Sequence, residues 1–140
     1  MDTRYQGSPV PVTAHQLARA KISDGKSVTV TVPQNTTINA GEWVLLDGFF
    51  GLAMQSAQTG ANETKQIVLN IEQAEYETDQ ITTGDTFAKG AVIYFNATTK
   101  KFTEAADDGE EPPAPHRKVG IVTSGKDANN VIWFLLGPQA

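Results

Sequence analysis

The chain has 140 residues, carries a formal net charge of -5 and contains no cysteine. This length suits one domain with its own core, and the missing thiols exclude disulfides and thiolate metal sites. The acidic balance argues against DNA or RNA as a direct partner, because nucleic-acid binding needs a basic face. No leader and no membrane-spanning apolar stretch is visible, so we expect synthesis in a reducing cytoplasm and no membrane partner.

Residues 1–20 are predicted to form an N-terminal arm outside the folded domain. Segment 8–12, Ser-Pro-Val-Pro-Val, is extended because each proline fixes its own φ and restricts the preceding residue. Segment 14–20 offers about two helical turns, too few for a stable isolated helix. Two alternatives stay open here: a frayed terminus, or an arm that becomes ordered against a neighbouring subunit.

Residues 21–140 alternate between turns and short runs rich in β-branched and aromatic side chains. Segment 28–32, Val-Thr-Val-Thr-Val, has the clearest alternation, which is typical of a strand with one wet face. The predicted strands are 28–32, 43–46, 49–54, 67–71, 91–95, 101–103, 119–122 and 131–136. Their number and spacing, without a long helix, predict an all-β fold: a single-domain β-sandwich or small barrel, with a jelly roll among the alternatives.

Three features refine this prediction. Gly51 within a strand indicates a bulge or a close backbone approach. The last strand, 131–136, is apolar on both faces, so we expect it to lie centrally in its sheet. Segment 104–116 is acidic and rich in proline, which predicts an exposed loop within the β domain of residues 21–140.

Residues Gly120 to Lys126 match the first seven positions of a phosphate-binding P-loop. The eighth position is Asp127, where a P-loop needs Ser or Thr to hold magnesium. A P-loop also runs from a strand into a helix, whose N-terminus binds phosphate, whereas Asn129 and Asn130 lead here into another predicted strand. We therefore predict no nucleotide site.

The titratable residues show no spacing typical of catalysis or metal binding. His15 and His116 lie in the arm and in the acidic loop, without the i, i+4 spacing of a helical metal site. Residues 72–80 are acidic but lack fixed ligand spacing, which indicates a solvated face. A facing pair of carboxylates leaves no mark in a sequence, so a small hydrolase stays as an alternative. We predict no enzyme, no catalytic residue, no cofactor and no metal.

The order of segments over residues 26–136 resembles that of the small capsid decoration proteins, or cement proteins, of tailed bacteriophages. Segment 43–53, Trp-Val-Leu-Leu-Asp-Gly-Phe-Phe-Gly-Leu-Ala, is similar to the family's strand and glycine leading into Phe-Gly-Val-Ala. Segment 81–96 is similar to the family's glycine, two residues and Val-Tyr-Trp, and segment 118–122 resembles its Ile-Gly-Val-Ala. The longer arm and the loop 104–116 depart from the simplest members.

The resemblance implies a non-enzymatic structural protein of the virion. Such proteins bind the outer surface of the phage head between major capsid protein subunits, and they hold neighbouring capsomers together against internal DNA pressure. The implied partners are the major capsid protein and the chain itself, with a homotrimer favoured and a homodimer as the alternative.

Contacts with the capsid or between subunits are expected from the arm and from large aromatic side chains. The candidate contact residues are Tyr5, Val10, Val12, His15, Leu17, Arg19, Trp43, Phe49 and Phe50. Core packing is the alternative for the aromatic residues, because only exposed rings mark an interface. The alternative function is a carbohydrate- or receptor-binding β-sandwich, in which an exposed Trp43 or Tyr94 would stack on sugar rings.

Overall fold

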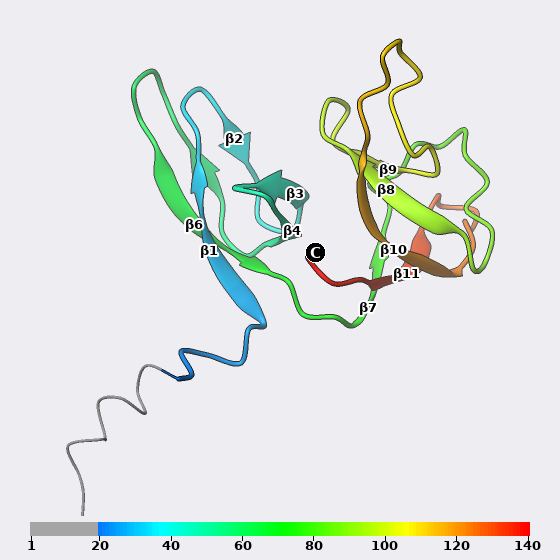
Figure 1. The fold of residues 1–140 in the computed structure, drawn as a ribbon, viewed down its shortest axis with the longest axis horizontal. Helices are drawn as coiled ribbons and strands as arrows, with labels where there is room; N and C mark the ends of the chain where they lie inside the picture. The colour runs from blue at the N-terminus through cyan, green and yellow to red at the C-terminus, as the bar shows by residue number, and fades with distance from the viewer. Residues whose placement is uncertain (1–19) are drawn as a thin grey trace, which may run out of the picture.

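The computed structural model describes residues 20–140, and this part of the chain contains strands and no helix (Figure 1). The strands are β1 (Ser27–Val32), β2 (Thr37–Ile38), β3 (Trp43–Leu46), β4 (Phe49–Ala53), β5 (Ala57–Gln58), β6 (Lys65–Asn70), β7 (Glu75–Thr78), β8 (Val92–Asn96), β9 (Lys101–Thr103), β10 (Arg117–Ser124) and β11 (Ile132–Leu136). The predicted all-β class is confirmed. The expected arm covers residues 1–20, and all of it except Ala20, an exposed turn residue, lies outside the described residues.

Two antiparallel sheets form the body of the protein. The first half of the chain forms a four-stranded sheet of order β1-β6-β4-β3, and the second half forms a five-stranded sheet of order β7-β11-β10-β8-β9. The short strands β2 and β5 pair with each other. Figure 1 shows the two larger sheets side by side, with the chain passing from the first to the second between β6 and β7.

The β3–β4 hairpin lies at the junction of the two sheets. Its turn residues, Asp47 and Gly48, both have positive φ, as a two-residue type I′ turn requires. Successive side chains of a strand point to opposite faces, and this hairpin is apolar on both. Trp43 packs into a cluster shared with the five-stranded sheet, whereas Val44 packs into a second cluster under the four-stranded sheet. The hairpin therefore connects both cores.

Aromatic rings form the centre of the shared core. Trp43 stacks on Phe50 at a centroid distance of 5.5 Å and meets Phe134 edge-on at 5.2 Å, while Phe50 lies 4.9 Å from Phe95. Phe102 contacts all four rings. Such pairs contribute about 0.5–1.5 kcal/mol each beyond the burial of their area. They attach the hairpin to the five-stranded sheet.

Two glutamine side chains hold the backbone of the same hairpin. Gln80 accepts a hydrogen bond from the Trp43 N–H and donates one to the Trp43 carbonyl, both at 2.9 Å. Gln139 makes the same pair of bonds with Phe50, at 2.9 and 2.8 Å. Each amide thus reproduces the two bonds of a neighbouring strand residue. The C-terminus returns to the hairpin to make the second contact (Figure 1).

All eight predicted strands occur, and no end of a strand differs from its predicted position by more than two residues. The close backbone approach at Gly51 is also confirmed, because a Cβ there would lie 2.7 Å from the Asn70 carbonyl oxygen. Strand β7 falls in the segment expected to be a solvated acidic face. Glu75 and Glu77 are exposed as expected, but the alternate residue Thr78 is buried against the core. Exposed and inward residues alternate along β7, as in other strands, but the two glutamates made the segment resemble a solvated loop.

Strand β11 lies between β7 and β10, so its predicted central position is confirmed. Its two apolar faces have different surroundings. Ile132, Phe134 and Leu136 are buried, whereas Trp133 and Leu135 are about half exposed, at 50% and 49%. Only one face of the five-stranded sheet is therefore covered.

Candidate functional site

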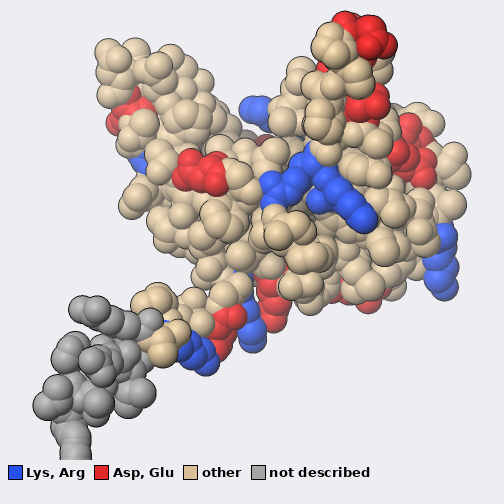
Figure 2. All heavy atoms as spheres, viewed as in Figure 1, with Lys and Arg blue, Asp and Glu red and all other residues tan. Residues whose placement is uncertain are grey.

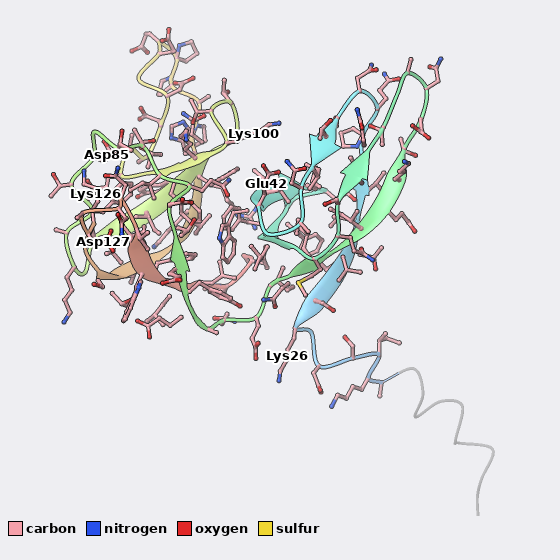
Figure 3. All side chains as sticks on the ribbon, turned by 180° about the vertical axis from the view of Figure 1, so that it is seen from behind. Lys26, Glu42, Asp85, Lys100, Lys126 and Asp127 are labelled. Carbon is pink, nitrogen blue, oxygen red and sulfur yellow. The ribbon has the colours of Figure 1, made fainter. Side chains whose placement is uncertain are left out.

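A cleft of about 620 Å³ opens between the two halves of the protein, beside the hairpin that joins them. Its walls are β3 with residues 36–38 and 41–42 on one side, and residues 79–80, 95, 97 and 99–101 on the other. Figure 2 shows it as a notch between two lobes, and Figure 3 shows Glu42 and Lys100 on its opposite sides. The cleft combines polar rims with the apolar side chains of β3.

The open side of the edge strand β3 faces this cleft. An edge strand can accept an extended segment through its free backbone groups. The side chain of Gln80 already occupies the N–H and carbonyl of Trp43. By strand alternation, Leu45 is the other residue of β3 whose backbone groups point toward the open side. Within β3, only the backbone N–H and carbonyl of Leu45 are therefore placed to pair with an added strand in the cleft.

The P-loop-like segment has a structural role. Its first five residues lie in β10, and the chain continues through a turn into β11 instead of a helix. The ammonium group of Lys126 donates hydrogen bonds to the carbonyl oxygens of Thr83 at 2.6 Å and Asp85 at 2.8 Å. Figure 3 shows Lys126 directed toward the Asp85 segment. Through these two bonds the ammonium fastens the turn at residues 83–85 to the segment that follows β10.

The acidic loop 104–116 is an ordered excursion from the five-stranded sheet, and residues 105–115 are exposed. The carboxylate of Asp108 accepts hydrogen bonds from the backbone N–H groups of Ala114 and Glu110, which lower its pKa below the usual range. The ring nitrogen Nδ1 of His116 lies 2.9 Å from the Ala105 carbonyl oxygen at the base of the loop. Figure 2 shows acidic side chains at its tip. These polar groups shape the loop.

The described residues 20–140 contain no group of three or more His, Asp or Glu side chains placed to hold a metal ion. Tyr76 has a shifted pKa for a structural reason. Burial raises its pKa above the usual value, a hydrogen bond from Asn70 opposes the rise, and the charge of Glu72 adds to it. The Tyr76 hydroxyl donates to the Glu72 carbonyl oxygen at 2.7 Å. It fastens the crossing between the sheets.

The structure corrects two of the candidate contact residues. Trp43 and Phe50 are 3% and 1% exposed, because they fill the aromatic core at the junction of the sheets. Phe49 is half-buried against the cluster of the four-stranded sheet, and Tyr94 is half-buried on β8. The candidates Tyr5, Val10, Val12, His15, Leu17 and Arg19 lie outside the described residues.

A surface that the sequence did not single out is the uncovered face of the five-stranded sheet. Ile121, Trp133 and Leu135 are 44%, 50% and 49% exposed there, and Ile121 pairs directly with Leu135. A signal for this face was present: in an antiparallel sheet one face usually meets water, so a strand apolar on both faces indicates an apolar surface. We call this surface the outer face.

These features define a β-sheet scaffold that presents a cleft, an apolar face and an acidic loop at its surface. The chain belongs to the phage cement protein family, whose model matches residues 22–136. It is therefore a structural protein of the phage capsid, found in the virion. Searches of curated proteins and of solved structures found no match. Within residues 20–140, no helix has the length and apolar character needed to cross a membrane.

Proposed function

We propose that the protein binds the outer surface of the phage head between major capsid protein subunits and stabilises the head against the pressure of the packaged DNA. The observation that carries this proposal is the family match over residues 22–136, which spans both sheets and the junction between them. The match supports attachment to the capsid. The position between major capsid protein subunits and the stabilisation against DNA pressure go beyond the match and are part of the proposal.

The construction of the protein is suited to this role. A protein that holds neighbouring capsomers must transmit force between its surfaces without deforming. The shared aromatic core and the two glutamine contacts join both sheets to one hairpin. Each contact with the shell can be weak, because repetition over a symmetric lattice and linkage between subunits give a large combined affinity.

The proposed partners are the major capsid protein and further copies of this chain. The family resemblance favours a homotrimer and leaves a homodimer as the alternative. For the carbohydrate-binding alternative, the ring of Trp43 is buried and has no face free for a sugar, which leaves the half-buried Tyr94 as its stacking residue.

We place the capsid contacts on the N-terminal segment and on exposed loops. The proposed contact residues are Tyr5, Val10, Val12, His15, Leu17 and Arg19, with Phe49 as a partly exposed addition. An arm that orders on binding adds contact area at an entropic cost. Apolar residues in this segment should therefore contribute more to binding than to folding.

The test is co-sedimentation of the purified chain with phage heads that lack it. We expect saturable binding, and we expect Val10→Asp, Val12→Asp and Leu17→Asp together to weaken it at least tenfold without changing the thermal unfolding of the free chain. The control carries three aspartates at exposed positions of the four-stranded half: Gln58→Asp, Thr64→Asp and Gln66→Asp. No binding by the unaltered chain would contradict the proposed function, and equal binding by both triple variants would contradict the role of the arm.

A further inference from the structure

An exposed indole lies beside two carboxylates on the outer face. Trp133 of β11 is 50% exposed, and an aromatic ring of this size contributes strongly to binding when a partner covers it. The strand register sets Glu77 of β7 directly opposite Trp133, and Glu75 opposite the next outward residue, Leu135. Both glutamates are exposed, and with Tyr76 and the indole they border an open hollow of about 240 Å³. The hollow thus combines an aromatic surface with two negative charges.

A β-bulge in β10 fixes one of these carboxylates. The pairing with β11 shifts between Val122 and Ser124, which makes Thr123 the extra residue of the bulge. A bulge re-aims the side chain that it carries, and the Thr123 hydroxyl donates a hydrogen bond of 2.6 Å to the Glu75 carboxylate. Because β11 lies between β10 and β7, this bond passes over β11. The Glu75 carboxylate is therefore held beside Trp133 before any partner binds.

No basic side chain of residues 20–140 forms an ion pair with Glu75 or Glu77. Lys118, a basic residue of the same face, lies near the start of β10, whereas Trp133 pairs with Ser124 at the end of that strand. The face of an aromatic ring attracts cations, as a carboxylate does, because its π-system is negative there. A positive group in the hollow would therefore interact favourably with the indole and with both carboxylates.

We propose that this hollow binds an arginine side chain of the major capsid protein, so that the outer face is one of the surfaces with which this chain holds the shell. The inference rests on the proposed function, which supplies the partner, and it adds a specific contact on the five-stranded sheet. Charge complementarity selects a basic group. Arginine fits better than lysine, because its planar guanidinium stacks on an indole and donates to carboxylates through several N–H groups, whereas the ammonium of lysine is a compact, strongly hydrated charge.

The surroundings of the hollow provide the apolar part of such a contact. Leu135 and Ile121 are 49% and 44% exposed and pair with each other beside the site. A partner that inserts an arginine next to Trp133 would cover both side chains, and the exclusion of water strengthens the attraction between charges. Trp and Arg are enriched at the centres of protein interfaces, where surrounding contacts keep water out. Binding should therefore require both the ring and the carboxylates.

Co-sedimentation with heads that lack this protein tests the site in full-length variants. We expect Trp133→Ala, and the double variant Glu75→Gln with Glu77→Gln, each to weaken binding at least tenfold. Trp133→Phe keeps an aromatic face and should bind with an intermediate affinity. The matched control, Glu63→Gln with Glu72→Gln, removes two exposed carboxylates outside the outer face and should bind like the unaltered chain. Thermal unfolding checks that all variants are folded.

A second measurement needs no heads. Acetyl-arginine amide is titrated into the free chain, with acetyl-citrulline amide as its uncharged counterpart. NMR follows the indole N–H signal of Trp133, which is assigned by its loss in Trp133→Phe. We expect a saturable shift with the arginine compound that is at least threefold larger than the shift with citrulline and is abolished in the double variant of Glu75 and Glu77. The N-terminal segment contains Arg4 and Arg19, and replacing both by Ala should not alter this response.

The two measurements separate this inference from the proposed function. Heads bound equally by the carboxylate variant and its control would overturn the inference and leave the proposed function standing. No binding of the unaltered chain to heads would contradict the proposed function, and the titration then decides whether the hollow binds a guanidinium group. Equal shifts with arginine and citrulline would overturn the inference. A shift that appears only after Arg4 and Arg19 are replaced would also overturn it, because the chain's own N-terminal segment would then occupy the hollow.

Discussion

Gly120 shows how closely β10 and β11 approach each other. A Cβ built at this position would lie 2.1 Å from the Leu135 carbonyl oxygen, which is part of the paired backbone and cannot rotate away. Gly84 provides a contrast, because a Cβ there would meet no heavy atom within 4 Å. Alanine at Gly120 would clash with a neighbouring strand, whereas alanine at Gly84 would not. Comparing the two positions therefore separates the cost of that clash from the general effect of replacing glycine by alanine.

Replacing Gly120 by Ala is expected to lower the free energy of unfolding by about 1–3 kcal/mol, the usual cost of forcing an extra carbon into a packed region. Gly84→Ala should change it by no more than about 0.5 kcal/mol, as at most surface positions. Urea unfolding followed by circular dichroism measures both. Equal stability of the two variants would show that the strands separate without cost.

Tyr76 gives the protein a pH dependence in the alkaline range. Its pKa is raised in the folded state, chiefly by burial, while the unfolded chain titrates near the ordinary value of about 10. The neutral hydroxyl therefore contributes its stability fully below about pH 10, and this contribution is lost as the pH rises through the folded pKa. Ionisation would also remove the hydrogen bond to the Glu72 carbonyl.

We expect the free energy of unfolding of the unaltered chain to fall more steeply above about pH 10 than that of Tyr76→Phe. Tyr94→Phe is the matched control, because it also removes a tyrosine from the β domain. Urea unfolding at a series of pH values gives the comparison. Parallel curves for the unaltered chain and Tyr76→Phe would contradict the assignment.

At the scale of elements, the β3–β4 hairpin connects the two halves of the fold. Its side chains pack into both hydrophobic clusters. Its backbone is held on one edge by Gln80, which follows β7 of the five-stranded sheet, and at Phe50 by Gln139 from the C-terminal tail. Arg117 strengthens the second contact, since its guanidinium donates to the carbonyl oxygens of Gly48 and Gln139 at 2.7 Å each.

Removal of either glutamine amide leaves partly buried backbone groups without partners. Gln80→Ala and Gln139→Ala are each expected to cost about 1–3 kcal/mol of unfolding free energy. Hydrogen exchange should accelerate at the Trp43 amide in the first variant and at the Phe50 amide in the second. Gln66→Ala, at an exposed position of β6, is the control. Unchanged protection of both amides would contradict a role for these side chains in holding the hairpin.

Much of the fold could be predicted because its strands follow simple patterns. The alternation of 28–32 and the apolar run 131–136 identify strands from the residues alone. Strand β7 was not predicted, because it has few inward residues and its exposed glutamates are typical of a loop. The contacts of Gln80 and Gln139 could not be predicted, because they join residues 37 and 89 positions apart. Sequence patterns report local periodicity and carry little information on such distant polar pairs.

The candidate contact residues show the same limit. The aromatic residues of segment 43–53 could belong to a core or to an interface, and only the packing of the second sheet against the hairpin places Trp43 and Phe50 inside. The exposure of Trp133 follows from the opposite cause, because no further element of residues 20–140 covers the outer face. Tertiary packing determines both the burial of Trp43 and Phe50 and the exposure of Trp133, and it leaves no local pattern in the sequence.

At the scale of the whole molecule, the two sheets, the cleft and the outer face form a scaffold with several separate surfaces. One hairpin carries the connection between the halves, so the surfaces keep fixed positions relative to one another. A protein that links neighbouring subunits of a shell needs this property, because a deformable connector would yield before it carried load. The proposed arm would then extend the contacts from one subunit to its neighbours.

The most direct test of the proposed role is the temperature at which DNA-filled heads lacking this protein release their DNA. Such heads are heated with and without the purified chain, and release is followed with a DNA-binding dye while bound protein is measured by sedimentation. We predict that added protein raises the release temperature in proportion to occupancy until the binding sites are full. Full occupancy with an unchanged release temperature would contradict the central claim that this protein stabilises the head.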